Sequence, residues 1–174
     1  PSAARLGGEE ALARLVAEMR AALASWQVGV AEAALHQTAA YVSTRQQFGR
    51  PLGSMQAVQQ RIADAYIDVE AMRSTSLLAN GLLDDTAPAA ADHATVTADA
   101  AVAGYWAALG GHRVTHAAQH LHGGMGADVN YPIHRYFLDA KARGLAAGGS
   151  QALLAVIGAE IAAGRVRRLS GVET

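Results

Sequence analysis

The chain has 174 residues, of which 51% are hydrophobic, so it can bury a core as one domain without disulfides or metals. It contains no cysteine, which excludes disulfide frameworks, thiolate nucleophiles and cysteine-bound metal clusters. The formal net charge is −1 and charges of both signs are scattered along the chain, so we expect no nucleic-acid partner and no anionic membrane surface.

The sequence gives no sign of a targeting or membrane segment. The first residues lack the apolar core of a signal peptide, and the acidic pair Glu9 and Glu10 is unlike a transit peptide. The longest uncharged run, Gly144 to Ala159, is interrupted by Gly148 and Gly149 and falls short of the roughly 20 apolar residues of a membrane span. We therefore expect a soluble cytoplasmic protein.

One long amphipathic helix is predicted from Glu9 to about Gln47, where the single glycine is Gly29. Large apolar residues recur there at three- and four-residue spacing, the pattern of one helix face. They are Leu12, Leu15, Met19, Leu23, Trp26 and Val30. The helix should end at Phe48-Gly49-Arg50-Pro51, because glycine permits a turn and proline disfavours a helical conformation in the residue before it.

A second long helix should follow, with Ser54 as its N-cap, and should continue to the Asp84-Asp85 turn and Pro88. Its apolar face comprises Met55, Val58, Ile62, Tyr66, Val69 and Met72.

A third helix is predicted from about Ala90 to Leu121, with Gly110-Gly111 as its weak point and Gly123-Gly124 as its stop. Its larger apolar residues include Val96, Val102, Trp106 and Val114.

Two shorter helices complete the chain. Pro132 suits the first turn of a helix that runs to about Arg143, and the last helix should run from about Ser150 to Ala163. No strand pattern is evident. We expect an all-α fold, an antiparallel up-and-down four-helix bundle with an additional short helix, forming one domain over residues 1–174.

Three histidines, His112, His116 and His120, share a helix face at four-residue spacing and could in principle chelate a metal. Carboxylates near them are sparse, and no Glu-x-x-His pair is present to build a di-metal site. We favour histidines on a helix face or at an interface, and we expect no metal site.

The segment His122-Gly-Gly-Met-Gly126 follows a helix and lacks the spacing of dinucleotide or phosphate loops that follow strands. One glycine suffices to stop a helix. Three glycines in four residues therefore indicate either a helix stop with more glycine than it needs or a site where another group approaches the backbone closely. Arg45, Arg50 and Gln56 bracket the first helix break, where their donors and the free N–H groups of the next helix could hold a pyrophosphate. Solvated surface arginines are the alternative.

Two segments are more specific than their local chemistry. The first is Tyr41-x3-Arg45-x2-Phe48-Gly49-Arg50-Pro51-Leu52-x3-Gln56-x2-Gln59-x2-Ile62-Ala63. The second is His122-Gly-Gly-Met-Gly126, followed by Tyr131-Pro-Ile-His-Arg135 and Asp139-Ala-Lys141. In order and spacing, both resemble motifs of the C-terminal helical domain of acyl-CoA dehydrogenases. The resemblance runs from about Leu12 to Ala163 and leaves out the family's N-terminal helical and middle β domains.

This resemblance implies FAD as cofactor and an acyl-CoA as substrate. It implies that Arg45, Phe48 and Gln56 contact the adenosine diphosphate part of FAD from one subunit, and that Gly123 and Gly124 contact it from a neighbour. It also assigns three further positions, namely Gln151 to the flavin, His120 to a place where the family has a flavin-contacting glutamine, and Arg20 to the acyl-CoA site.

The catalytic carboxylate of the family has no counterpart here. Members carry a glutamate that abstracts the substrate α-proton either before the last helix, where this chain has Ala147, or on the first helix, where it has Met19. Neither side chain accepts a proton, and a general base contributes typically about 10²–10⁴-fold to rate.

The resemblance therefore implies a non-catalytic subunit of a bacterial heteromeric acyl-CoA dehydrogenase, of the kind that handles fatty or steroid-derived CoA esters. Its partner would be a homologous subunit, in a dimer or tetramer, that contributes the glutamate. Two alternatives remain open: a flavin-free structural dimerisation bundle, and a fragment of an active enzyme whose base comes from elsewhere.

Overall fold

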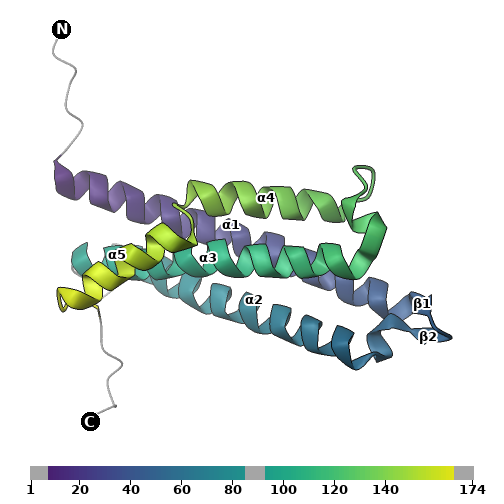
Figure 1. The fold of residues 1–174 in the computed structure, drawn as a ribbon. Coiled ribbons are helices and arrows are strands. Elements are labelled where there is room, and N and C mark those ends of the chain that lie inside the picture. The colour runs from purple at the N-terminus through teal and green to yellow at the C-terminus, as the bar shows by residue number, and fades with distance from the viewer. Residues whose placement is uncertain (1–7, 85–92, 167–174) are drawn as a thin grey trace, which may run out of the picture.

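The computed structural model describes residues 8–84 and 93–166, and these residues are mostly helical (Figure 1). The helices are α1 (Glu9–Thr44), α2 (Gln56–Leu83), α3 (His93–His122), α4 (Ile133–Ala146) and α5 (Ser150–Ala162). A strand pair, β1 (Gln46–Gln47) with β2 (Arg50–Pro51), and two 3-10 turns, η1 (Leu52–Ser54) and η2 (Gly123–Ala127), connect them. The predicted all-α bundle with an additional short helix is confirmed.

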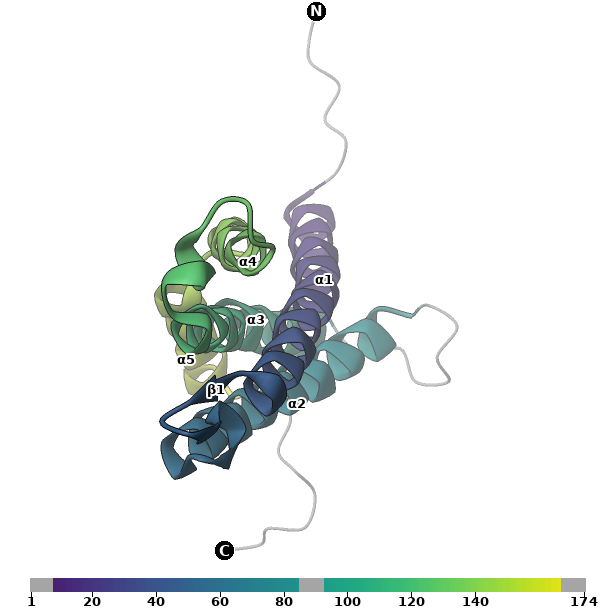
Figure 2. The same cartoon turned by 90° about the vertical axis from the view of Figure 1, so that its right-hand side faces the viewer.

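Helix α3 lies at the centre of the bundle. It packs against α1, α2, α4 and α5, and α4 also packs against α1 (Figures 1 and 2). Helix α5 crosses the N-terminal half of α3, and Leu153 of α5 is buried there against Ala101 of α3. The C-terminal ends of α1 and α3 meet at the opposite end of the molecule, so the loops that follow these two helices lie at one end.

The face of α1 that packs in the core is not the predicted one. Its buried residues are Ala17, Ala21, Ala24, Gln27, Val28, Ala31, Ala34, Leu35, Thr38 and Val42. In contrast Leu12 and Leu15 are each 61% exposed, and Trp26 and Met19 are exposed as well. Small side chains allow the helix axes to approach closely, so a stripe of alanines can fill the core that large residues were expected to fill. The large residues form a separate exposed apolar stripe.

The glycine pair in α3 also differs from prediction, because the helix runs through Gly110 and Gly111 without a break. Both glycines are buried, and they pack against side chains of α1 and α2. A Cβ atom at Gly110 would overlap the Met72 side chain of α2, and one at Gly111 would overlap the Gln27 side chain of α1. The pair is therefore a packing contact and not a weak point.

Several predicted boundaries shift. Ser54 does not cap α2, since it lies in η1 and donates to the Pro51 carbonyl at 2.7 Å, while Met55 holds the cap position. The two-residue strand pair was not predicted. The last two helices match their predicted ranges closely. The predicted start of α3 at Ala90, the turn residue Asp85 and Pro88 lie outside the described residues.

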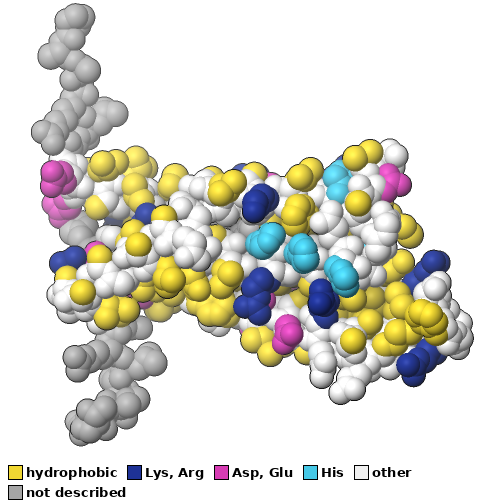
Figure 3. All heavy atoms as spheres, in the orientation of Figure 1, with side chains coloured by type: hydrophobic (Ala, Val, Ile, Leu, Met, Phe, Trp, Pro, Cys, Tyr) yellow, Lys and Arg dark blue, Asp and Glu magenta, His cyan; other side chains and the backbone are white. Residues whose placement is uncertain are grey.

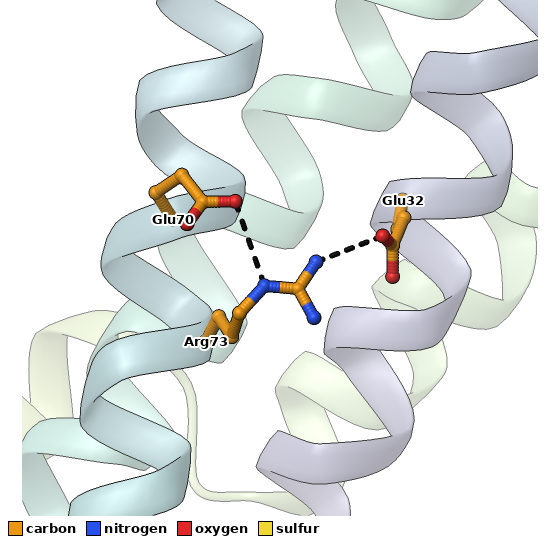
Figure 4. A network of polar contacts seen from close by, with 3 residues as sticks. All are labelled: Glu32, Glu70 and Arg73. Carbon is orange, nitrogen blue, oxygen red and sulfur yellow. Dashed lines mark hydrogen bonds and ion pairs between the residues drawn. The ribbon is translucent and has the colours of Figure 1, made fainter.

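A polar contact links the first two helices on the surface. Arg73 of α2 donates to Glu32 of α1 at 2.8 Å and to Glu70 of its own helix at 3.5 Å (Figure 4). All three side chains are more than a third exposed, so this contact fixes alignment more than it adds stability.

The stretch Ile133–Ala162 is long and apolar enough for a possible membrane span, because it contains an 18-residue window with a mean hydropathy of 1.5, of which 11% is buried. The structure divides it at Gly148 and Gly149 into α4 and α5, which run in different directions (Figure 1). Neither helix alone reaches the roughly 20 residues of a span. Helix α5 buries Leu153 and exposes Leu154 and Ile161, so it presents an apolar surface.

Candidate cofactor site

A tight hairpin follows α1 and presents an aromatic side chain to solvent. Gln47 pairs with Arg50 across the two strands, so Phe48 and Gly49 form a two-residue loop. Both have positive φ, 54° and 75°, as the type I′ hairpin turn requires. Positive φ costs a residue with a Cβ roughly 1–2 kcal/mol, and Phe48 is nevertheless 89% exposed. The fold gains no burial from this strained phenylalanine, which points to a role outside the core.

The hairpin is held rigidly by its backbone. The Arg45 N–H donates to the Tyr41 carbonyl at 2.9 Å, and the Leu52 N–H donates to the Arg45 carbonyl at 2.8 Å. The side chains of Arg45 and Arg50 are exposed, and no described carboxylate forms an ion pair with either. Helix α2 begins at Gln56 without a side-chain cap. Two unpaired guanidinium groups and an open helix N-terminus thus surround the loop, a favourable setting for a phosphate group.

A glycine turn closes α3. Gly123 has a φ of +62°, a conformation that favours glycine. At Gly126 a Cβ would overlap the Gln119 backbone, so this position also requires glycine. Neither reason applies to Gly124, since its φ is not positive and a Cβ there would meet nothing within 4 Å. Gly123 and Gly124 are both exposed. The backbone at Gly124 is therefore open to approach by a group from outside the chain.

The hairpin and the glycine turn lie at the same end of the bundle. The rings of Tyr41, in the last turn of α1, and His122, the last residue of α3, stack at 4.1 Å between centroids. Both loops face the viewer in Figure 2. Most of the residues predicted to bind FAD therefore lie at this one end of the bundle. They are Arg45, Phe48 and Gln56 around the hairpin, Gly123 and Gly124 in the glycine turn, and the exposed His120 in the last turns of α3.

The remaining predicted residues lie elsewhere, around the turn between α4 and α5. Gln151 is exposed in the first turn of α5, away from the hairpin end (Figure 1). Arg20 of α1 is partly buried, and its Nε has no hydrogen-bond partner among the described residues. Burial lowers the pKa of Arg20 from its ordinary value. A Cβ at Gly104 would touch both Arg20 and Leu153, so the guanidinium stem borders the apolar cluster beneath α5.

Ala147, which the sequence resemblance assigns to the family's base position, is part of that cluster. Its side chain is 2% exposed and packs with Ala101 and Leu153. A carboxylate at this position would lose its water, which raises the free energy of its charged form. The other base position, Met19, is exposed on the apolar stripe of α1.

Histidine side chains gather on the face seen in Figure 3, with basic side chains beside them. His112 contacts both His116 and the ring of Phe137, at 5.8 Å in each case. Burial, then Lys141 and His116, lower the pKa of His112. No group of three or more metal-ligating side chains comes together within the described ranges. Beside these histidines, buried Asp68 pairs with Arg113 at 3.1 Å, in a cleft of about 260 Å³.

Comparisons with known proteins identify the family of this chain. A family model described as "Acyl-CoA dehydrogenase, C-terminal domain" matches residues 7–162. The chain belongs to the acyl-CoA dehydrogenase family. Acyl-CoA dehydrogenase FadE27 of Mycobacterium tuberculosis is 44% identical over 167 residues, which cover 92% of this chain and 43% of that protein. FadE28 of the same organism is 35% identical and covers 80% of this chain and 39% of its own length.

Solved structures give the same result. The ChsE4-ChsE5 complex from Mycobacterium tuberculosis has a TM-score of 0.84 and 43% identity, covering 92% of this chain and 42% of that chain. A Tcur3481-Tcur3483 steroid ACAD variant has a TM-score of 0.83 and 48% identity, covering 90% of this chain and 42% of that chain. The chain thus spans less than half the length of the relatives that it matches.

Proposed function

We propose that this chain is the FAD-binding and subunit-pairing domain of an acyl-CoA dehydrogenase subunit that lacks its own catalytic base. Its partner is a homologous subunit that carries the glutamate, and the assembly converts an acyl-CoA thioester to the 2,3-enoyl-CoA. FAD, when bound, accepts the hydride that leaves the substrate. This chain's residues bind and orient the cofactor, and the partner's carboxylate takes the α-proton.

The strained, exposed Phe48 carries the proposal. A fold that maintains a phenylalanine in a positive-φ loop, between two unpaired arginines, gains nothing from it internally. An aromatic ring placed there can stack on a nucleotide base, while Arg45 and Arg50 bind phosphate oxygens. The open backbone of Gly124 supplies a surface that the same cofactor can approach.

Subunit pairing is supported by apolar surface that the described residues leave uncovered. Helix α5 exposes Leu154 and Ile161, and the beginning of α1 exposes Leu12 and Leu15. Hydrophobic side chains extend over both regions in Figure 3. A helix as apolar as α5 is normally covered, because exposed apolar patches mark interaction sites.

Two of the similar solved structures support the proposed heteromeric partner and suggest a substrate class. One similar structure is a complex of two differently named chains, and another is described as a steroid ACAD. Steroid-derived CoA esters are therefore the first substrates to test, before linear acyl-CoA esters.

Co-expression and co-purification with a homologous subunit that carries the glutamate test the proposal. The complex should show flavin absorbance and form enoyl-CoA from a suitable ester. Replacing both hairpin arginines, Arg45→Gln with Arg50→Gln, should lower flavin content at least about 10-fold, since each charge-assisted bond contributes about 1.5–3 kcal/mol. Arg61→Gln, an exposed arginine on α2, is the matched control and should leave flavin content unchanged.

A flavin-free structural bundle is the second candidate. It is favoured by the buried apolar surroundings of Ala147 and by His120 at a position where the family has glutamine. A stable colourless complex with the homologous subunit would support this candidate and retire the flavin proposal.

A further inference from the structure

The histidine that ends α3 is buried between two tyrosines. His122 is 3% exposed, and its ring stacks on that of Tyr41 at 4.1 Å with an interplanar angle of 21°. On its other side the ring of Tyr131 lies 5.2 Å away, tilted by 50°. This one imidazole joins the end of α3 to the end of α1, which is far away in sequence, and to Tyr131 in the loop that follows α3.

Its position connects the two loops of the candidate cofactor site. Tyr41 precedes Arg45 by one helical turn, and the Tyr41 carbonyl accepts the Arg45 N–H. His122 is bonded directly to Gly123, whose backbone turns away from the helix with φ of +62°. The stack of His122 on Tyr41 therefore connects the glycine turn to the hairpin through the backbones of these two residues.

Packing alone does not explain a histidine at this place. Both ring nitrogens are buried without a hydrogen-bond partner among the described residues. An unsatisfied buried polar group costs about 1–3 kcal/mol, and phenylalanine would fill a similar volume without that cost. A costly residue held in a close stack beside a functional turn indicates a role in that turn.

We propose that His122 is a positioning residue for the cofactor site: its ring, held between Tyr41 and Tyr131, fixes the Gly123–Gly124 turn against the hairpin. The proposal rests on the FAD-binding function proposed above. The imidazole does not touch the cofactor, and it acts through the backbone that does.

Protonation of the ring weakens this arrangement. Burial lowers the pKa of His122 from the ordinary value of 6.5, so the folded chain holds it neutral. The titratable groups that face it are Tyr41 from α1 and Tyr131 from the segment before α4. Burial, then Tyr41, raise the pKa of Tyr131. A depressed pKa stabilises the fold above about pH 6.5, and that stability is lost as pH falls towards the folded pKa. The stack should therefore loosen in mild acid.

The test measures FAD affinity of the full assembly between pH 5.5 and 8 for three forms of the chain. Wild-type affinity should fall below about pH 6.5. His122→Phe keeps the stack and removes the proton site, so its affinity at pH 8 should stay within about 3-fold of wild type and lose the acid-dependent decrease. His122→Ala removes the ring and should weaken binding about 10-fold or more at every pH, with unchanged helical content.

The sign of the pH effect separates His122 from exposed histidines. Protonation of His120, beside the same site, would strengthen binding of an anionic cofactor, so it cannot produce an acid-dependent loss. His36→Gln, an exposed histidine on α1, is the control and should follow the wild-type profile. Wild-type affinity in His122→Ala, or an acid-dependent loss that persists in His122→Phe, would overturn the proposal.

A second readout keeps the positioning claim separate from the cofactor claim. Hydrogen-exchange protection of the Gly124–Gly126 amides, measured without cofactor, should fall in His122→Ala and should fall in acid for wild type but not for His122→Phe. If every form fails to bind FAD while protection follows this pattern, the FAD proposal fails and the positioning role stands. Protection that is insensitive to His122 would overturn the positioning role itself.

Discussion

The hairpin end and the Ala147 region differ in backbone strain, solvent exposure and packing, although the family resemblance assigns functional positions to both. At the hairpin end, exposed arginines, a strained phenylalanine and an open glycine backbone are kept at a cost to stability. Around Ala147, small and apolar side chains are closely packed, and the position is 2% exposed. The hairpin end thus keeps exposed groups that a ligand could contact, whereas the Ala147 region has the packing of an ordinary core.

This difference separates cofactor binding from proton abstraction. A site that had lost both functions would be expected to relax towards unstrained, well-packed structure at both places, because most sequence changes that relieve strain raise stability. Of the two regions, only the Ala147 region is unstrained and well packed. The comparison therefore favours a subunit that still binds a cofactor and leaves the proton-accepting step to a partner.

The largest effect is expected for Ala147→Glu. A carboxylate placed in this apolar cluster should reduce the free energy of unfolding by about 2–4 kcal/mol, because desolvation penalises its charge. The loss should be greater at pH 8 than at pH 5, since burial raises a carboxyl pKa and the neutral form is the less costly one. Urea denaturation at the two pH values measures it, with exposed Ala146→Glu as the control, expected within about 0.5 kcal/mol of wild type. Equal stability of the two variants would show that the Ala147 region can open for a carboxylate.

A smaller effect of opposite sign is expected for Phe48→Asn. Asparagine tolerates positive φ, and Asn-Gly is the preferred pair of the type I′ turn, so stability should rise by up to about 1 kcal/mol. FAD affinity should fall at the same time, because the stacking ring is lost. Thermal unfolding and flavin titration measure the two changes, and Leu138→Asn, which removes an exposed apolar residue of α4, should change neither by much. A stability gain without loss of affinity would mean that the strained ring has no part in binding.

The sequence was sufficient to predict the helices and their order, because long periodic segments and the Gly-Pro break at Gly49–Pro51 are local signals. It misidentified the core face of α1, since a hydrophobic pattern weights Leu12 and Leu15 above alanines and cannot indicate which stripe faces the rest of the chain. Close helix approach, as at Gly111, depends on a partner helix far away in sequence. The two-residue strands of the hairpin are too short to show alternation.

The sequence predicted which residues make up the candidate site, but it did not predict their backbone conformation or their burial. The motif placed Arg45 and Phe48 at a helix break, and the structure brings both to the same end as Gly124. The positive φ of Phe48 could not be inferred, because it results from a register set by the strand pair. The burial of His122 was missed because Tyr41, the tyrosine that stacks on it, comes from another helix far away in sequence. A histidine immediately before a glycine stop was the one signal available.

The central claim is that the glycine turn stays open for a cofactor, and Gly124→Ala tests it most directly. A Cβ at Gly124 meets nothing within 4 Å, so the variant should fold and assemble as wild type does. Gly81→Ala, at an equally open position in α2, is the matched control. FAD titration of the assembled complexes should show binding weakened about 10-fold or more by Gly124→Ala and unchanged by Gly81→Ala. Equal FAD affinity in the two variants would contradict the account.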